Sequence, residues 1–218
     1  QGRQGHEEGQ GLLMSLLANA YGNFLSSALP YYQTMPGIIT PYGTLLKPGG
    51  RIAAYVRSTG AVDGEDHFAA SGMLVTTLQA GLARCRSGND DIVYVLPGHT
   101  ENISTADFMT SLVAGTQIVS AGRPGATNNP NFTWTAVGST FLLDVADVSL
   151  FGLTLTMGGA DNVTAPITVT GAGCAIMGCH IIAGTSTALE SATPITVSTG
   201  AADCRIVVHG TITPRSIT

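Results

Sequence analysis

The second half of the chain is a series of short apolar segments separated by small and polar residues. The sequence Pro-Ile-Thr-Val occupies residues 166–169 and returns 28 positions later, at residues 194–197. After each copy comes a Gly/Ala-rich step and then an apolar segment with a cysteine, first Cys174 and then Cys204. Short β segments that repeat every ~25–30 residues are typical of a stacked, solenoid-like β architecture. The pattern therefore predicts stacked strands in this region.

The segment around Val148 fits the same repeat, because Val148 lies 26 positions before Cys174, and Cys174 lies 30 positions before Cys204. Equivalent positions of stacked repeats lie one above another, so we expect these three residues in one inward-facing row. Both cysteines are expected to be reduced and buried as small hydrophobes, although a disulfide stays open if the Cβ geometry allows it. A second, apolar row is expected from Leu150, Ile176 and Ile206.

Further apolar runs upstream of these repeats are bounded by Gly, Pro, Asn or Asp, and each predicts a short strand. An alternating run predicts a strand at residues 51–58, and a buried strand at 91–96 stops at a Pro-Gly pair. The other strands are expected at 116–120, 132–135, 140–145 and 148–157.

A helix is predicted at residues 71–88, immediately before the strand at 91–96. Leu74, Leu78, Leu82 and Cys85 fall on one stripe of such a helix. Ser71 and Gly88 are suitable caps for its two ends. We expect this helix to cover the first strands of a β domain at residues 71–218, where it would bury an apolar end and block end-to-end association.

The N-terminal region, residues 1–58, is predicted to be an arm rather than part of the β domain. Helical spacing of apolar residues predicts a short amphipathic helix at 11–29, and the prolines and glycines of 30–50 predict an extended segment. Residues 1–50 are expected to attach the protein to a partner and to be dispensable for folding. The surface on which the arm docks, on this chain or on a neighbouring subunit, is left open. The candidate partner-binding residues are Leu13, Leu17, Phe24, Tyr31, Tyr32 and Tyr42.

The composition is that of a weakly charged protein. Only 11% of the 218 residues are charged, Lys47 is the single lysine, and the formal net charge is −5. This balance, without a basic stripe, argues against nucleic-acid binding, and no apolar run reaches the ~18 residues of a membrane span. So few surface charges favour a protein that buries much of its surface against partners, although a compact, Thr-covered solenoid has a similar composition.

Candidate chemistry is sparse. The acidic segment at 59–67 contains Asp63, Glu65 and Asp66, which fits either a Ca²⁺ site or, better, a solvated turn, because the spacing of a calcium loop is missing. The four cysteines lack a matching His pattern for a metal. We therefore predict no catalytic, metal or cofactor-binding residue. The remaining polar residues considered and set aside are Asp144, Asp147, Asp161, Arg205, Arg215, His99 and His180.

Over residues 71–212 the chain resembles the pectate-lyase-like right-handed parallel β-helix superfamily. The resemblance implies an all-β fold, a short right-handed parallel β-helix (solenoid) with an N-terminal capping helix and an extended N-terminal arm. It implies nothing about activity, because the superfamily contains lyases, hydrolases, esterases, epimerases and inert structural coils. The residues that carry the resemblance are Leu78, Leu82, Val93, Val95, Pro97, Gly98, Glu101, Ile118, Gly122, Val148, Leu150, Gly152, Leu153 and Leu155.

With its low lysine content, its Thr/Ala/Gly-rich sequence and its Pro-rich arm, the chain is also similar to virion proteins of tailed bacteriophages. That similarity implies a structural virion protein, most simply a capsid decoration or cement protein of the head. Its expected partners are the major capsid protein and itself, as a homotrimer. The alternative is a tailspike or tail-fibre β-helix module that binds or cleaves host surface glycans, and a free carbohydrate-active enzyme is the third hypothesis. The sequence does not decide between head and tail.

Overall fold

The computed structural model describes residues 51–58, 72–122, 127–157, 163–182, 191 and 193–211. The chain divides into two compact units, residues 1–35 and 36–218, and every described residue belongs to the second. All strand pairings among the described residues are parallel. Within these ranges the only α-helix is α4 (Leu78–Leu82). The expected all-β class is therefore confirmed, as a mostly parallel β structure.

The described strands form three parallel groups. The first contains β1 (Ile52–Val56), β3 (Ile92–Val95), β5 (Gln117–Ser120), β8 (Ser149–Phe151), β11 (Ala175–Ile182) and β13 (Arg205–Thr211), with β2 (Leu74–Val75) beside β1. The second contains β4 (Thr100–Ile103), β6 (Asn131–Trp134) and β9 (Thr154–Met157), and it joins the first because the far end of β11 pairs with β9. The third is a separate sheet of β7 (Phe141–Leu143), β10 (Ile167–Val169) and β12 (Ile195–Val197).

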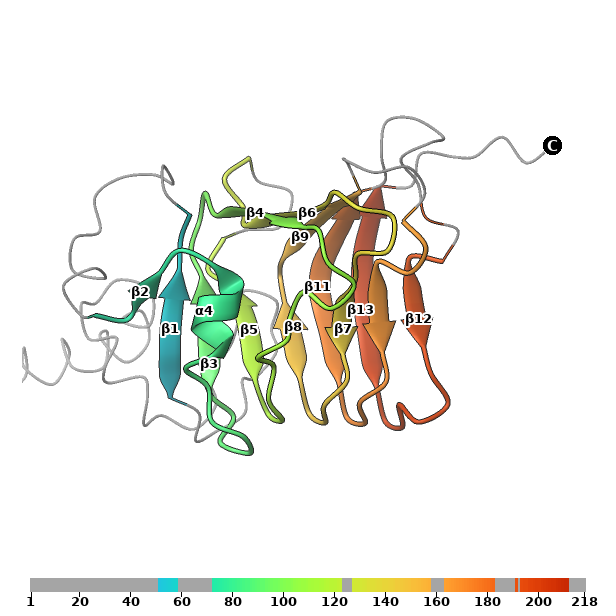
Figure 1. Ribbon diagram of the computed structural model, residues 1–218, viewed down its shortest axis with the longest axis horizontal. Helices are drawn as coiled ribbons and strands as arrows, with labels where there is room; N and C mark the ends of the chain where they lie inside the picture. The colour runs from blue at the N-terminus through green and yellow to red at the C-terminus, as the bar shows by residue number, and fades with distance from the viewer. Residues whose placement is uncertain are drawn as a thin grey trace, which may run out of the picture. The chain divides into compact units, whose positions relative to one another are not determined.

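The three groups recur in a fixed order along the chain. Strands β5, β6 and β7 are followed by β8, β9 and β10, and then by β11 and β12. Members of each group pair with their counterparts in the neighbouring set. Figure 1 shows the strands of the first group side by side and pointing the same way, with α4 lying against β1 and β3.

The predicted register of the repeats is confirmed. Ile167 pairs with Ile195, as the two Pro-Ile-Thr-Val copies require. Ile176 pairs with Leu150 on one side and with Ile206 on the other. The same row continues through earlier strands, since Leu150 pairs with Ile118 and Ile118 with Val93. Sequence repetition thus placed these side chains correctly on one face of the sheet.

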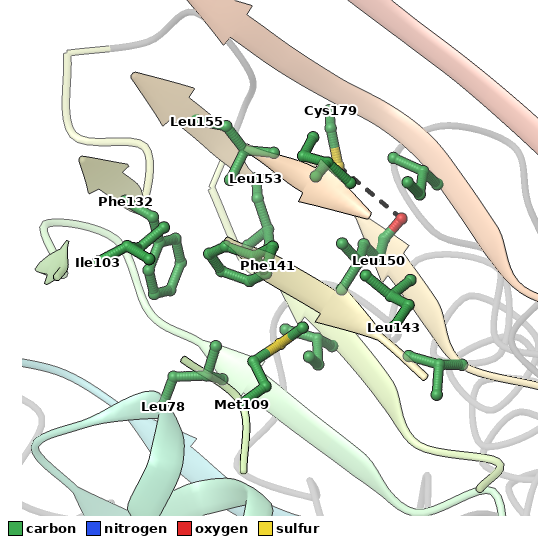
Figure 2. Packing of buried hydrophobic residues seen from close by; sticks show 14 of the residues in the cluster. Leu78, Ile103, Met109, Phe132, Phe141, Leu143, Leu150, Leu153, Leu155 and Cys179 are labelled. Atoms are coloured by element: carbon green, nitrogen blue, oxygen red, sulfur yellow. Dashed lines mark hydrogen bonds between the residues drawn. The ribbon is translucent and has the colours of Figure 1, made fainter. Parts of the chain in front are cut away.

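The core lies between the three groups of strands. Figure 2 shows leucine and phenylalanine side chains from β6, β7, β8 and β9 meeting in its centre. Phe132 and Phe141 are fully buried and pack edge to face, with ring centroids 5.4 Å apart. Trp134 is also buried and lies edge-on to Phe141 at 6.0 Å. Each such side chain contributes roughly 1.5–3 kcal/mol by leaving water, so this cluster holds the groups of strands together.

A row of tight turns precedes the strands of the first group. The residue two positions before each of β5, β8, β11 and β13 has a positive φ angle: 84° at Gly115, 60° at Asp147, 70° at Gly173 and 56° at Asp203. Neighbouring turns are joined through the backbone, because the N–H of Gly173 donates to Ala202 O at 2.8 Å and that of Asp147 to Ala172 O at 2.8 Å. Glycine and aspartate tolerate this conformation better than other residues do.

The predicted helix at 71–88 is wrong in extent. Helix α4 begins after Thr77, whose side chain accepts a hydrogen bond from the Ala80 N–H at 3.2 Å, and it ends at Leu82. Residues 74 and 75 form β2 instead, because the edge of β1 offers them backbone hydrogen bonds. A Cβ on Gly81 would lie 3.0 Å from the side chains of Val56 and Val93. Glycine there lets α4 pack closely on β1 and β3.

Candidate functional site

His99 and Glu101 form the centre of a buried polar network near the N-terminus of α4. The Nδ1 atom of His99 accepts a hydrogen bond from the backbone N–H of Ser58 at 2.9 Å. Its Nε2 atom lies 3.0 Å from Glu101 Oε2, which also accepts from the backbone N–H of Leu78 at 2.8 Å. The His99 side chain is fully buried, and that of Glu101 is 14% exposed.

These contacts determine which ring nitrogen of neutral His99 carries the proton. Because Nδ1 accepts from Ser58, the ring proton of neutral His99 lies on Nε2 and is donated to Glu101. Both ring nitrogens are therefore occupied inside the protein. The network joins the end of β1, the start of β4 and the first turn of α4.

Asp91 is the centre of a second network, at the start of β3. Its carboxylate accepts from the Arg86 backbone N–H at 2.9 Å, from Arg86 Nη2 at 3.1 Å and from Arg51 Nε at 3.3 Å. The Asp91 side chain is fully buried, whereas the two arginines are about half exposed, at 53% and 44%. Burial alone would raise the pKa of Asp91, but the hydrogen bonds from Arg86 and the two positive charges outweigh it and hold the pKa below its ordinary value.

Asn129 carries a third network, which links β5 to β9. Its Nδ2 donates to Gly152 O at 3.1 Å and to Thr154 Oγ1 at 2.6 Å, and its Oδ1 accepts from Ser120 Oγ at 2.9 Å. A Cβ on Gly122 would come within 2.4 Å of Asn129 Oδ1, so the loop has no room for a larger residue there. The sequence offered no signal for this network beyond an asparagine at a strand boundary.

The structure does not bring the predicted site residues together. The arm residues Leu13, Leu17, Phe24, Tyr31, Tyr32 and Tyr42 lie outside the described residues, as do Asp63, Glu65, Asp66, Asp161 and Arg215. Asp144, Asp147 and Arg205 are exposed, and His180 is half-buried on β11. In the part of the chain that the structure describes, no three His, Cys, Asp or Glu side chains gather closely enough to hold a metal ion.

The predicted burial of the two repeat cysteines is confirmed at Cys174 and is wrong at Cys204. None of the four forms a disulfide. Cys174 is 1% exposed, which confirms its expected burial. Cys204 is only half-buried, because it precedes β13, and among the described strands β13 pairs only with β11. Burial of Cys179 raises the pKa of its thiol to about 12.

Comparison with known protein families, with curated proteins and with solved structures finds no match to this chain. Among the described residues, no helix has the length and apolar character needed to cross a membrane.

Proposed function

We propose that the second unit is a short right-handed parallel β-helix and that the chain is a structural protein of a tailed-phage virion. The fixed order of the three strand groups supports the coil, because each set of strands corresponds to one turn and pairs with the next. The right hand follows from the strong preference of parallel crossover connections. Helix α4 would then cap the first turns of the coil, over β1 and β3.

The observation that carries a structural role is how the buried polar side chains are used. Asp91, His99 and Asn129 each bind groups on neighbouring strands or turns of the protein itself. Their hydrogen bonds hold neighbouring strands and turns in place. Buried polar groups that are fully paired make a structure rigid and unique. A rigid stack of strands in a chain with few charges is suited to reinforcing a particle surface.

In this proposal the protein decorates the head shell, as a capsid decoration or cement protein. It binds the major capsid protein through its N-terminal arm and associates with itself as a homotrimer. The arm residues that make the contact are Leu13, Leu17, Phe24, Tyr31, Tyr32 and Tyr42. Many copies on one shell multiply a weak contact into stable attachment.

The experiment is to separate heads from tails of the encoding phage and to identify the chain in each fraction by mass spectrometry. The proposal expects it in heads. Detection in tails alone would overturn the head assignment and favour the tailspike or tail-fibre alternative. Absence from the particle would overturn the virion role altogether.

A binding assay tests the arm. Shells that lack the protein are mixed with the full chain, with a Leu13→Asp/Leu17→Asp variant, and with a control carrying Val197→Asp, an exposed residue of the second unit. The arm variant should bind far fewer copies than the full chain and the control. Equal occupancy by all three proteins would show that the arm is not the anchor.

A further inference from the structure

Two cysteines occupy equivalent places beside neighbouring strands of the first group. Cys174 directly precedes β11, and Cys204 directly precedes β13. The two strands pair in register from Ala175 and Arg205 onward. The Arg205 N–H also donates to Cys174 O at 2.9 Å, and the tight turns on the other side of the two cysteines are joined through the backbone as well. Cys174 and Cys204 are therefore lateral neighbours, one strand spacing apart.

The two thiols also point to the same side of the backbone. Each one contacts a carbonyl oxygen that lies further back along the chain. Cys174 Sγ is 3.4 Å from Val145 O, and Cys204 Sγ is 3.5 Å from Gly171 O. Cys174 is a buried member of the main core, and Cys204 packs against that core. Both sulfur atoms therefore face the interior from adjacent positions.

The spacing of the two residues suits a disulfide. Neighbouring strands lie ~4.8 Å apart, which is within the range of about 4.4–6.8 Å between the Cα atoms of a disulfide. The Cβ atoms of a disulfide are about 3.8 Å apart, so the bond draws the two residues together by about 1 Å. Both follow a tight turn and precede a strand, where such a shift breaks no pairing inside the sheet. The other two cysteines are placed differently, since Cys179 pairs with Val208 and Cys85 lies just after α4.

We propose that Cys174 and Cys204 are a redox-sensitive pair, which a peroxide converts to a disulfide that fastens β13 to β11. Cys204 is half-buried and Cys174 is 1% exposed, so the oxidant reaches Cys204. With hydrogen peroxide, the Cys204 sulfur takes one oxygen atom and becomes a sulfenic acid, and one water is released. The Cys174 sulfur then attacks the Cys204 sulfur, the S–O bond breaks, and the hydroxide leaves with the Cys174 thiol proton as a second water. Two electrons pass in total from the two thiols to the peroxide.

The bond would strengthen the least buried part of the described stack. Among the described strands β13 pairs only with β11. Val207 on β13 is 44% exposed, whereas its partner Met177 on β11 is 7% exposed. Val197 on β12 is 46% exposed, whereas its partner Val169 on β10 is 1% exposed. Strands with few buried contacts open before the rest of a domain, and a disulfide restricts the opened chain. Oxidation should therefore hold the last strands closed, and this inference does not depend on the proposed function.

Oxidation of the full chain tests the pair. The reduced protein is treated with hydrogen peroxide, the remaining thiols are alkylated in denaturant, and the peptides are analysed by mass spectrometry without reduction. Cleavage after Glu190 separates the two cysteines. We expect a disulfide between Cys174 and Cys204 within one chain, which still forms in Cys179→Ala and is absent from Cys174→Val. Oxidation of the two thiols without a disulfide, or a disulfide to Cys85, to Cys179 or to a second chain, would overturn the proposal.

Amide hydrogen exchange tests the fastening itself. The amides of β13 should exchange roughly tenfold more slowly in the oxidised than in the reduced wild-type protein, while those of β3 and β5 change little. The matched control carries Cys174→Val and Cys204→Val, because valine already stands at the equivalent position before β8, at Val148. Peroxide should leave β13 exchange in this control unchanged, and the control also shows any effect of methionine oxidation. No slowing in the wild-type protein, or equal slowing in the control, would overturn the proposal.

Discussion

At the scale of single residues, the turns before the first strand group show how backbone conformation selects the sequence. Asp147 and Gly173 occupy equivalent places in neighbouring turns, and both have a positive φ angle. A Cβ on Gly173 would come within 2.5 Å of Asp147 Oδ1. The aspartate side chain therefore occupies the space that the neighbouring glycine leaves free.

Gly173→Ala should consequently destabilise the protein by about 1–2 kcal/mol from backbone strain alone, and by more from the clash. Denaturant unfolding measures the effect, with Gly138→Ala as a control, because a Cβ on Gly138 meets nothing within 4 Å. Asp147→Gly should relieve part of the loss in a double-mutant cycle. Purely additive effects would contradict this packing.

The Asp91 network predicts a specific pH dependence. The pKa of Asp91 is lower in the folded protein than in the unfolded chain, where it is about 3.9. Its contribution is therefore complete above about pH 5 and is lost as the pH falls through the folded pKa. Asp91→Asn should cost on the order of 3 kcal/mol at pH 7 and flatten the fall in stability that the wild-type protein shows below about pH 5. The exposed Asp144→Asn control should retain the wild-type profile.

Thiol accessibility can be checked residue by residue. In the folded protein, a thiol reagent at neutral pH should modify Cys204 before Cys174 and Cys179, because Cys204 is half-buried near the last described strand. Cys174 and Cys179, at 1% and 0% exposure, should react only when the protein opens. Mass spectrometry of peptides gives the order of labelling. Modification of Cys179 at the rate of Cys204 would show that the core is not closed.

At the scale of elements, the row through Ile118, Leu150, Ile176 and Ile206 joins consecutive strands of the first group. Ile176 is fully buried in the middle of this row. Ile176→Ala should therefore lower the free energy of unfolding by ~2–5 kcal/mol. Val197→Ala, on the 46% exposed side chain of β12, should change it little. An unaltered melting temperature in Ile176→Ala would mean that the register is wrong.

At the scale of the whole second unit, the shared core predicts one cooperative transition. Trp134, the only tryptophan, is fully buried beside Phe141. Its fluorescence reports the packing at the centre of the core, while far-ultraviolet circular dichroism reports the content of β-strand in the whole protein. We expect the two signals to change together on heating or in denaturant. Separate midpoints would show that the strand groups unfold independently.

The sequence by itself determined most strand positions and the register of the later repeats, but it missed β4 and predicted one strand at 148–157 where the structure has two, β8 and β9. Ile167 and Ile195 share a local sequence and pair as expected, because repeated apolar spacing allows only one alignment that keeps every side chain on its proper face. The helix was predicted over too long a range, because periodicity could not show that β1 offers residues 74 and 75 a strand partner.

Only the tertiary structure decided the polar networks and the burial of β3 on both of its faces. Ser58 and His99 are 41 positions apart, and Asn129 reaches Gly152 and Thr154 across adjacent strands. No local pattern encodes such contacts, because they depend on how separate strands are stacked. The alternation of Ile92, Val93 and Tyr94 also looks like a strand buried on both faces. That both faces are in fact covered followed only from the exposure of each side chain in the folded chain.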